Sequence, residues 1–385
     1  MKRKICVITG SRAEYGLFNP LLRKLSACHD LRLQMIVTGS HLLPEHGLTW
    51  KEIVRDGFPI SAKVPILTPG KDTAMGPAIA SAIAGIGPAL SRLRPHAVAL
   101  LGDRYETFAA AVSAFTARIP IVHIHGGETT EGALDEGFRH SITKMSWLHF
   151  TSTPEYRRRV IQLGEAPGRV YCSGALGVDN ALGAGLMSRE ELEKDLGFSF
   201  DGTTALVTFH PETFADASPA RQVRELLGAL ETMTDLRVLF TMPNADPGSA
   251  EIGRAIRSFA AGRPGQRAFF ASLGRVRYLS AMKYCRLVAG NSSSGIIEAP
   301  SFGKPVVDIG GRQKGRVAAL SVLHCRAERA AIVGALKKAL TPGFSRAAAK
   351  AKNPYGDGNA ASRICAVLRG RVSAAPAAAK KFYDL

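Results

Sequence analysis

The chain has 385 residues, 46% of them hydrophobic, and a formal net charge of +18. This length is too great for one ordinary core and fits two average domains, and the hydrophobic content excludes a disordered chain. No apolar run reaches the roughly 18 residues of a membrane span, and the first residues run into a strand pattern instead of a signal sequence, so we expect a cytoplasmic protein without membrane contact.

The positive charge favours an anionic partner. Basic residues are nevertheless scattered, only Arg157, Arg158 and Arg159 form a dense run, and no helix-turn-helix, RNP or zinc-finger signature accompanies them. We therefore expect a phosphorylated small molecule and no nucleic acid. The six cysteines are far apart and form no C-x-x-C pair, which predicts small core residues in a reducing compartment.

Apolar runs alternate with helical patterns in the first half of the chain. We expect a helix at residues 15–25 and strands at residues 4–10, 31–39, 97–103 and 119–127, each strand ending in a Gly-containing turn. This alternation predicts a parallel sheet covered by helices on both faces.

The second half restarts the rhythm, with strands expected at residues 204–211, 236–243, 286–293 and 304–311. The pattern breaks in the Gly-rich stretch 174–186, before a helix-like segment at 188–196. We expect two Rossmann-like, doubly wound domains over residues 1–180 and 181–358, followed by a C-terminal helix and tail over 359–385. The Ala-rich tail after Val372 is expected to pack poorly, apart from its final KKFYDL.

Neither half carries the G-x-G-x-x-G of a dinucleotide fold or a P-loop. In open parallel sheets, ligands still bind at the carboxyl ends of the strands. The turn from Asn291 to Gly295 ends such a strand and opens a short helix, whose free N–H groups and serine hydroxyls (Ser292, Ser293) suit a phosphate or diphosphate. The alternative is that Ser292 is only an N-cap.

Four further polar residues could contact the same phosphorylated ligand. Glu298 follows about one helical turn later, within reach of a ribose diol, and Arg312 ends the next strand and can add a permanent charge. Arg12 precedes a helix of the first domain, and His210 ends the first strand of the second domain. Either residue could instead have only a structural role, Arg12 as a surface charge at a helix start and His210 as a capped, hydrogen-bonded turn residue.

Acid–base groups gather at two strand ends of the first domain. Asp103 and Arg104 follow one strand, His123 and His125 are two apart on the next and should share a face, and Glu128, Glu131, Asp135 and Glu136 follow. Such a concentration is expected where protons are moved. A metal site with both histidines is a weaker alternative, and a serine hydrolase lacks its G-x-S-x-G elbow.

At these residues the chain resembles the hydrolysing UDP-N-acetylglucosamine 2-epimerases of bacterial sialic acid and legionaminic acid synthesis. The matching stretches span nearly the whole chain and are TGSRAEYG, VTGSHLLPEHGLTWKEI, LLGDRYE, HIHGGETTEGALDEGFRHSITKM, FHPET, MPNADPGS, GNSSSGIIEAPSFGKPVVDIGGRQKGR and NPYGDGNA.

The resemblance implies a glycosyltransferase-B-like fold with a UDP-sugar in the interdomain cleft and a C-terminal helix packing back on the first domain. It also implies a homodimer through the first domains. The implied reaction removes the C2 proton and expels UDP, and water then adds to the resulting glycal to release free N-acetylmannosamine. Neither a nicotinamide cofactor nor a metal is implied.

Residue roles are carried over by similarity. Asp103 and Asp135 are the acid–base candidates with Arg104 orienting them, Glu298 is the ribose ligand, and the diphosphate binders are Arg12, His210, Ser292, Ser293 and Arg312, with Gly295 in the same turn.

Two residues depart from the family pattern. His125 stands where relatives place a glutamate, and we expect it to move a proton with Glu128 as its nearest carboxylate. Glu14 stands where many relatives have aspartate, and we expect it only to line the cleft.

Three alternatives stay open. The sugar could be UDP-2,4-diacetamido-2,4,6-trideoxyglucose, as in legionaminic acid synthesis. The enzyme could be a non-hydrolysing epimerase. From another class, the chain could be a UDP-sugar-binding or basic nucleic-acid-binding module. The clustered acids at Asp103 and Asp135 argue against both, because acids repel an anionic ligand unless they take part in a reaction.

Overall fold

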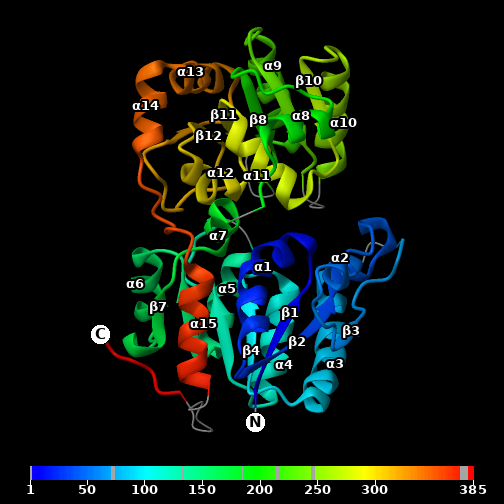
Figure 1. Ribbon diagram of the computed structural model, residues 1–385, viewed down its shortest axis with the longest axis vertical. Coiled ribbons are helices and arrows are strands. Elements are labelled where there is room, and N and C mark those ends of the chain that lie inside the picture. The colour runs from blue at the N-terminus through cyan, green and yellow to red at the C-terminus, as the bar shows by residue number, and fades with distance from the viewer. Residues whose placement is uncertain are drawn as a thin grey trace. The chain divides into compact units, whose positions relative to one another are not determined.

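The computed structural model describes residues 2–70, 74–131, 134–183, 185–212, 217–243, 248–372 and 380–385. The chain forms two compact units, each built from a sheet with helices against it (Figure 1). Unit 1 comprises Met1–Glu128, Leu134–Asn180 and Tyr355–Leu385, and unit 2 comprises Thr129–Ala133 and Ala181–Pro354. The poorly packed extension expected after Val372 falls on residues 373–379, outside the described residues.

Unit 1 contains a seven-stranded parallel sheet in the order β3-β2-β1-β4-β5-β6-β7. Its strands are β1 (Arg3–Thr9), β2 (Leu31–Thr38), β3 (Ala62–Val64), β4 (Ala97–Leu101), β5 (Ile121–Ile124), β6 (Leu148–Thr151) and β7 (Val170–Cys172). Its helices are α1 (Arg12–Ala27), α2 (Trp50–Arg55), α3 (Met75–Leu93), α4 (Tyr105–Thr116), α5 (Asp135–Met145), α6 (Pro154–Gln162) and α15 (Ala360–Arg371), with short 3-10 turns at Gly39–Leu42, Pro44–His46 and Pro167–Arg169. Helix α7 (Leu176–Leu182) crosses from unit 1 into unit 2.

Both faces of the unit 1 sheet are buried, which explains its continuous apolar strands. Ile5 and Val7 of β1 join a core that contains residues of α1 and α15. Cys6 and Ile8, on the opposite face, join a second core with α3 and α4. Figure 1 shows α15 next to α1, so two helices far apart in the sequence cover the same face.

Unit 2 contains a six-stranded parallel sheet in the order β10-β9-β8-β11-β12-β13. Its strands are β8 (Thr204–Thr208), β9 (Arg237–Thr241), β10 (Arg267–Phe270), β11 (Leu287–Gly290), β12 (Val306–Ile309) and β13 (Val322–Cys325). Its helices are α8 (Arg189–Leu196), α9 (Pro219–Glu231), α10 (Ser249–Ala261), α11 (Gly274–Tyr284), α12 (Ser293–Ile297), α13 (Arg329–Leu340) and α14 (Pro342–Lys350), with a 3-10 turn at Ala299–Phe302. Residues of α9, α10 and α13 pack with β8 and β9 in its main core.

These observations confirm the two expected α/β folds, each with a parallel sheet, and all the strands predicted from the sequence. The cysteine prediction is confirmed for Cys6, Cys285 and Cys365, which are buried, and wrong for Cys172, which is exposed at the end of β7. None of the described helices is long and apolar enough to cross a membrane.

Candidate active site

A buried arginine holds the acid–base cluster of unit 1 together. Arg139, on α5, is fully buried, and its Nε donates to Oδ2 of Asp103 at 2.8 Å, just beyond the end of β4. Its Nη1 donates to the carbonyl oxygen of Glu128 at 2.8 Å and contacts the Glu136 carboxylate. A guanidinium with donors in a fixed fork can therefore hold Asp103, the Glu128 carbonyl and Glu136 at once.

Asp135 is the first residue of α5 and is half-buried. Burial raises the pKa of its carboxyl, and the nearby Asp103 carboxylate raises that pKa further, against the opposing charges of Arg104 and Arg139. Two neighbouring carboxylates thus have different environments, one paired with an arginine and the other biased toward holding a proton. This is the arrangement that separates a base from an acid.

Arg104 does not contact Asp103 as the sequence analysis expected. Its Nε lies 3.2 Å from Oε2 of Glu106, on α4, and its Nη2 lies 3.2 Å from Oε1 of the same carboxylate. The bidentate pair forms because Glu106 is buried beside Arg104 and two residues away along the chain. Arg139 takes the orienting role toward Asp103, and sequence spacing gave no sign of it because 36 residues separate the two.

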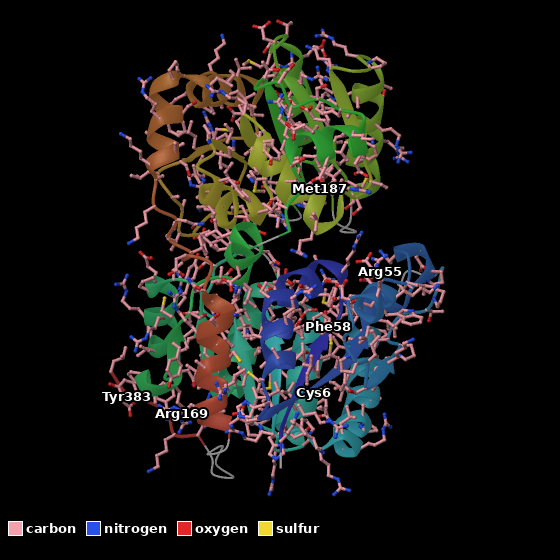
Figure 2. All side chains as sticks on the ribbon, viewed as in Figure 1. Cys6, Arg55, Phe58, Arg169, Met187 and Tyr383 are labelled. Atoms are coloured by element: carbon pink, nitrogen blue, oxygen red, sulfur yellow. The ribbon has the colours of Figure 1, made fainter. Side chains whose placement is uncertain are left out.

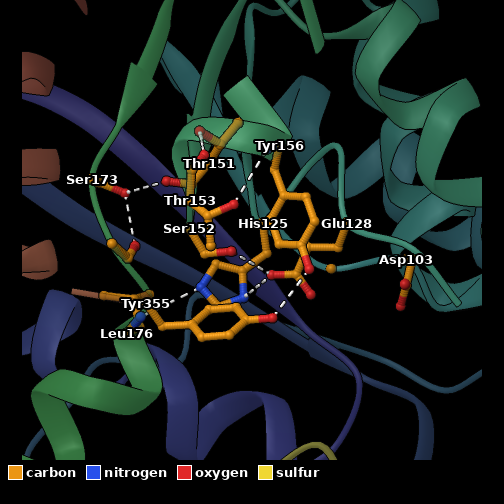
Figure 3. Close-up of polar contacts among 12 residues, drawn as sticks. Asp103, His125, Glu128, Thr151, Ser152, Thr153, Tyr156, Ser173, Leu176 and Tyr355 are labelled. Carbon is orange, nitrogen blue, oxygen red and sulfur yellow. Dashed lines mark hydrogen bonds and ion pairs between the residues drawn. The ribbon is translucent and has the colours of Figure 1, made fainter. Parts of the chain in front are cut away.

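His125 and Glu128 lie together at the end of β5 (Figure 3). His125 Nδ1 is 3.4 Å from Oε1 of Glu128, which also accepts a hydrogen bond from Ser152 Oγ at 2.8 Å. The Leu176 N–H donates to His125 Nε2 at 3.4 Å. Both side chains are buried, and both ring nitrogens of His125 are contacted, Nδ1 by the Glu128 carboxylate and Nε2 by the Leu176 N–H.

The backbone at His125 is strained. Its φ is +66°, in the left-handed region that a residue with a Cβ rarely adopts, and strand β5 ends one residue earlier at Ile124. His123 and His125 consequently contact different groups instead of sharing partners, since His123 bonds to Gly102 and Thr143. Among the described residues, no group of three His, Cys, Asp or Glu side chains could hold a metal ion.

The two predicted residues at the start of α1 have separate surroundings. Arg12 pairs with Glu52 of α2, Nη2 to Oε1 at 3.0 Å, and its side chain is partly exposed. Glu14 is buried and accepts from the Gly10 N–H at 2.7 Å and from Thr9 Oγ1 at 3.1 Å. Burial raises the pKa of Glu14 to about 7. Glu14 therefore closes the β1–α1 turn from inside.

In unit 2, the end of β11 approaches β8 very closely. Gly290 has φ +128°, and a Cβ there would lie 1.9 Å from the carbonyl oxygen of Thr208. Only glycine fits this position. The chain can then turn sharply into the serine-rich segment that precedes α12.

Asn291 ties three strand ends of unit 2 together, a function that sequence reasoning missed. Its Oδ1 accepts from the His210 N–H at 2.7 Å and its Nδ2 donates to the His210 carbonyl at 2.8 Å. Its own carbonyl accepts from Arg312 Nη1 at 3.2 Å and from Gln313 Nε2 at 2.8 Å. Fully buried Asn291 therefore fixes His210 and Arg312 on either side of the serine turn.

His210 is buried and electrically neutral at ordinary pH. Burial lowers the pKa of its imidazole, the Arg312 charge lowers it further, and the pKa reaches about 3. A neutral ring beside a permanent cation can accept or donate a hydrogen bond to an anion without the cost of burying a second charge.

The serine turn leaves the first N–H groups of α12 without a side-chain cap. Ser292 occupies the N-cap position, but its hydroxyl lies 3.0 Å from Ser294 Oγ, which is 2.6 Å from the Tyr278 hydroxyl. Ser293 is the first residue of α12. Ser292 therefore occupies the N-cap position without making the N-cap hydrogen bond.

Gly295 and Glu298 complete this segment. A Cβ on Gly295 would come within 3.2 Å of Val306 Cγ1, so glycine lets α12 pack on β12. Glu298 follows α12 directly and is buried. The structure thus brings His210, the serine turn and Arg312 together in unit 2. In unit 1 it places Asp103, His125 and Glu128 beyond strand ends, with Asp135 at the start of α5 near Asp103.

Several known proteins are similar to this chain in sequence. A family model described as UDP-N-acetylglucosamine 2-epimerase matches residues 23–369. A hydrolysing GDP/UDP-N,N'-diacetylbacillosamine 2-epimerase of Campylobacter jejuni is 38% identical over 84% of both chains. The polysialic acid biosynthesis protein P7 of Escherichia coli is 38% identical over 100% of this chain and 98% of its own length.

A solved structure shares the fold. The crystal structure of a UDP-GlcNAc 2-epimerase from Neisseria meningitidis bound to UDP-GlcNAc matches with a TM-score of 0.82 at 18% identity, covering 96% of this chain and 100% of the other.

Proposed function

Because the chain belongs to the UDP-N-acetylglucosamine 2-epimerase family, we propose that it is a hydrolysing UDP-sugar 2-epimerase acting on UDP-N-acetylglucosamine. The observation that carries the proposal is the pair of carboxylates in unit 1. Asp103 is held by Arg139, while the pKa of Asp135 is raised by burial and by Asp103. Such a pair suits removal of a weakly acidic proton next to a leaving group.

The nucleotide half of the substrate is assigned to unit 2. Arg312, neutral His210 and the uncapped N–H groups at Ser293 offer donors to a diphosphate, and these groups would stabilise the charge that develops as UDP leaves. Glu298 follows the same helix and supplies a carboxylate for the ribose hydroxyls.

The reaction proceeds in two balanced steps. A base of unit 1 takes the C2 proton while the C1–O bond breaks, which gives the glycal and UDP. Water then adds its hydroxyl to C1 and gives its other proton to a carboxylate of unit 1, while an acid returns a proton to C2 on the other face, which gives N-acetylmannosamine. We assign these transfers to Asp103 and Asp135, with the His125 and Glu128 pair as a further proton carrier.

Proton NMR in heavy water tests the proposal. The purified chain incubated with UDP-N-acetylglucosamine should release one UDP per sugar, and deuterium should replace the hydrogen at C2 of the product. Asp135→Asn should abolish both changes, whereas Glu155→Gln, at an exposed position on α6, should leave them intact. Accumulation of an epimerised UDP-sugar without free UDP would contradict the hydrolysing assignment.

A second substrate has its own support. The Campylobacter relative, named for N,N'-diacetylbacillosamine, is as similar in identity as the Escherichia coli protein. The alternative substrate is therefore UDP-2,4-diacetamido-2,4,6-trideoxyglucose. Parallel incubations at equal concentration decide between the two sugars, and the preferred one should show the larger kcat/KM.

A further inference from the structure

The last residues of the chain return to unit 1 and cap helix α5. Lys380 Nζ donates to the carbonyl oxygens of Lys144 at 2.7 Å and Ser146 at 2.8 Å, with the Thr143 carbonyl at 3.4 Å. It also lies 2.8 Å from Oε1 of Glu165. The carbonyl groups in the last turn of a helix lack partners within the helix, and the negative end of the helix dipole attracts a cation. Lys380 satisfies both requirements for α5.

The carboxylate that receives Lys380 is fully buried. Glu165 has no exposed surface, and it accepts from Lys144 Nζ at 2.9 Å and from His149 Nε2 at 3.0 Å. Burial alone would raise the pKa of Glu165, but the hydrogen bonds from His149 and both lysines outweigh it and lower the pKa to about 2. A carboxylate that stays charged inside the protein needs its cations, and Lys380 is one of them.

A second anchor holds the segment after Lys380. The Tyr383 N–H donates to the Gly164 carbonyl at 3.0 Å, and Figure 2 labels Tyr383 in the same region of unit 1 as Arg169. The Phe382 ring lies against Gly164, where a Cβ would come within 2.2 Å of it. Lys144 Nζ lies 4.8 Å from the centre of this ring. Residues 380–383 are thus held by side-chain and main-chain contacts together.

The capped turn of α5 is connected to the acid–base cluster. Thr143 Oγ1 is 3.1 Å from Nδ1 of buried His123, whose Nε2 lies 2.9 Å from the carbonyl oxygen of Gly102. Gly102 directly precedes Asp103. The same helix begins at Asp135 and carries Arg139. Movement of α5 would therefore displace both carboxylates and the guanidinium between them.

We propose that residues 380–385 form a C-terminal strap that fixes helix α5, with Lys380 as a positioning residue for Asp135 and Arg139. The strap touches no reacting atom, and its effect on turnover rests on the proposed function. It acts by keeping the acid–base groups in one geometry, since a displacement of about 1 Å can cost roughly 100-fold in rate.

A matched pair of variants tests the strap in the full chain. Lys380→Met removes the ammonium and keeps the chain length, while Lys381→Met makes the same change at the exposed neighbour. We expect Lys380→Met to lower kcat about tenfold or more with little change in KM, and to speed amide hydrogen exchange in α5 by about tenfold. Lys381→Met should match the parent protein in both. Equal kcat and equal α5 exchange in the two variants would overturn the proposal.

Removal of residues 380–385 offers a second, independent test. If the shortened protein keeps its far-ultraviolet circular dichroism, a labelled peptide of the sequence KKFYDL should bind it and restore slow exchange in α5, and a peptide with methionine at the Lys380 position should not. If the KKFYDL peptide also fails to bind, the strap is refuted. If the shortened protein does not fold, the Lys380→Met result decides. Exchange and peptide binding require no substrate, so they test the strap even if no UDP-sugar is turned over.

Discussion

Replacement of Arg139 by methionine should expose how much of unit 1 depends on a single buried cation. The substitution removes the guanidinium that contacts Asp103, Glu136 and the Glu128 carbonyl, while it keeps an unbranched apolar stem. Two acidic side chains and one carbonyl then lose the hydrogen bonds that Arg139 donates to them.

The magnitude follows from the burial of the pair. Removing one partner of a fully buried ion pair costs about 3–5 kcal/mol. The Arg139 side chain is 1% exposed but that of Asp103 is 24% exposed, so water partly screens the carboxylate that remains. We therefore expect a loss near the lower end, about 3 kcal/mol, which corresponds to a drop in the Tm of unit 1 of roughly 6–12 °C.

Urea denaturation followed by circular dichroism measures this loss. Arg158→Met is the matched control, because Arg158 is 73% exposed and lies 3.7 Å from Glu155, and it should change the unfolding free energy by less than about 0.5 kcal/mol. In the double variant with Asp103→Asn, the loss should be smaller than the sum of the single losses. If Arg139→Met is as stable as Arg158→Met, the reasoning about the buried pair is refuted.

Three further changes should give distinct results. Burial raises the pKa of Glu14 from 4.5 to about 7, so ionisation of this carboxyl destabilises the fold as pH rises through that window. Glu14→Gln should therefore flatten the dependence of the urea midpoint on pH between pH 5 and 8. An unchanged slope would argue against a buried carboxyl. Arg312→Lys keeps the positive charge but loses the planar fork of guanidinium N–H donors, so calorimetry should show UDP binding about tenfold weaker. Equal affinity would mean that Arg312 does not belong to the diphosphate site. Cys28 Sγ and Cys365 Sγ are 3.2 Å apart, so diamide should join them and consume two thiols in the parent protein but not in Cys365→Ser, as read by mass spectrometry.

The sheets were predictable because their strands are long or apolar on both faces. Residues 4–10 and 204–211 read as strands from composition alone, and the structure has β1 and β8 there. Strand β6 (Leu148–Thr151) was missed because two of its four residues are His and Thr, whereas the equally short β5, β11 and β12 contain at most one polar residue each. The helix at 188–196 was visible because Ser188 and Glu191 form a capping box.

The residue types of the site were predictable, but their partners were not. Acids at the ends of β4 and β5 follow from topology, which brings parallel strand ends to one edge. Arg139 and Asn291 act on groups 36 and 81 residues away, and spacing along the chain carries no information about such contacts.

The division of unit 1 into separate chain segments affects the order in which the protein can mature on the ribosome. Helix α15 supplies Ala361, Ile364 and Leu368 to the same core as Ile5 and Phe18, yet it is translated after all of unit 2. Nascent unit 1 must wait with the part of this core that α15 covers still exposed until residues 360–371 emerge, while unit 2 already has its own core. Nascent chains stalled just before residue 360 should accordingly recruit chaperones to the N-terminal half.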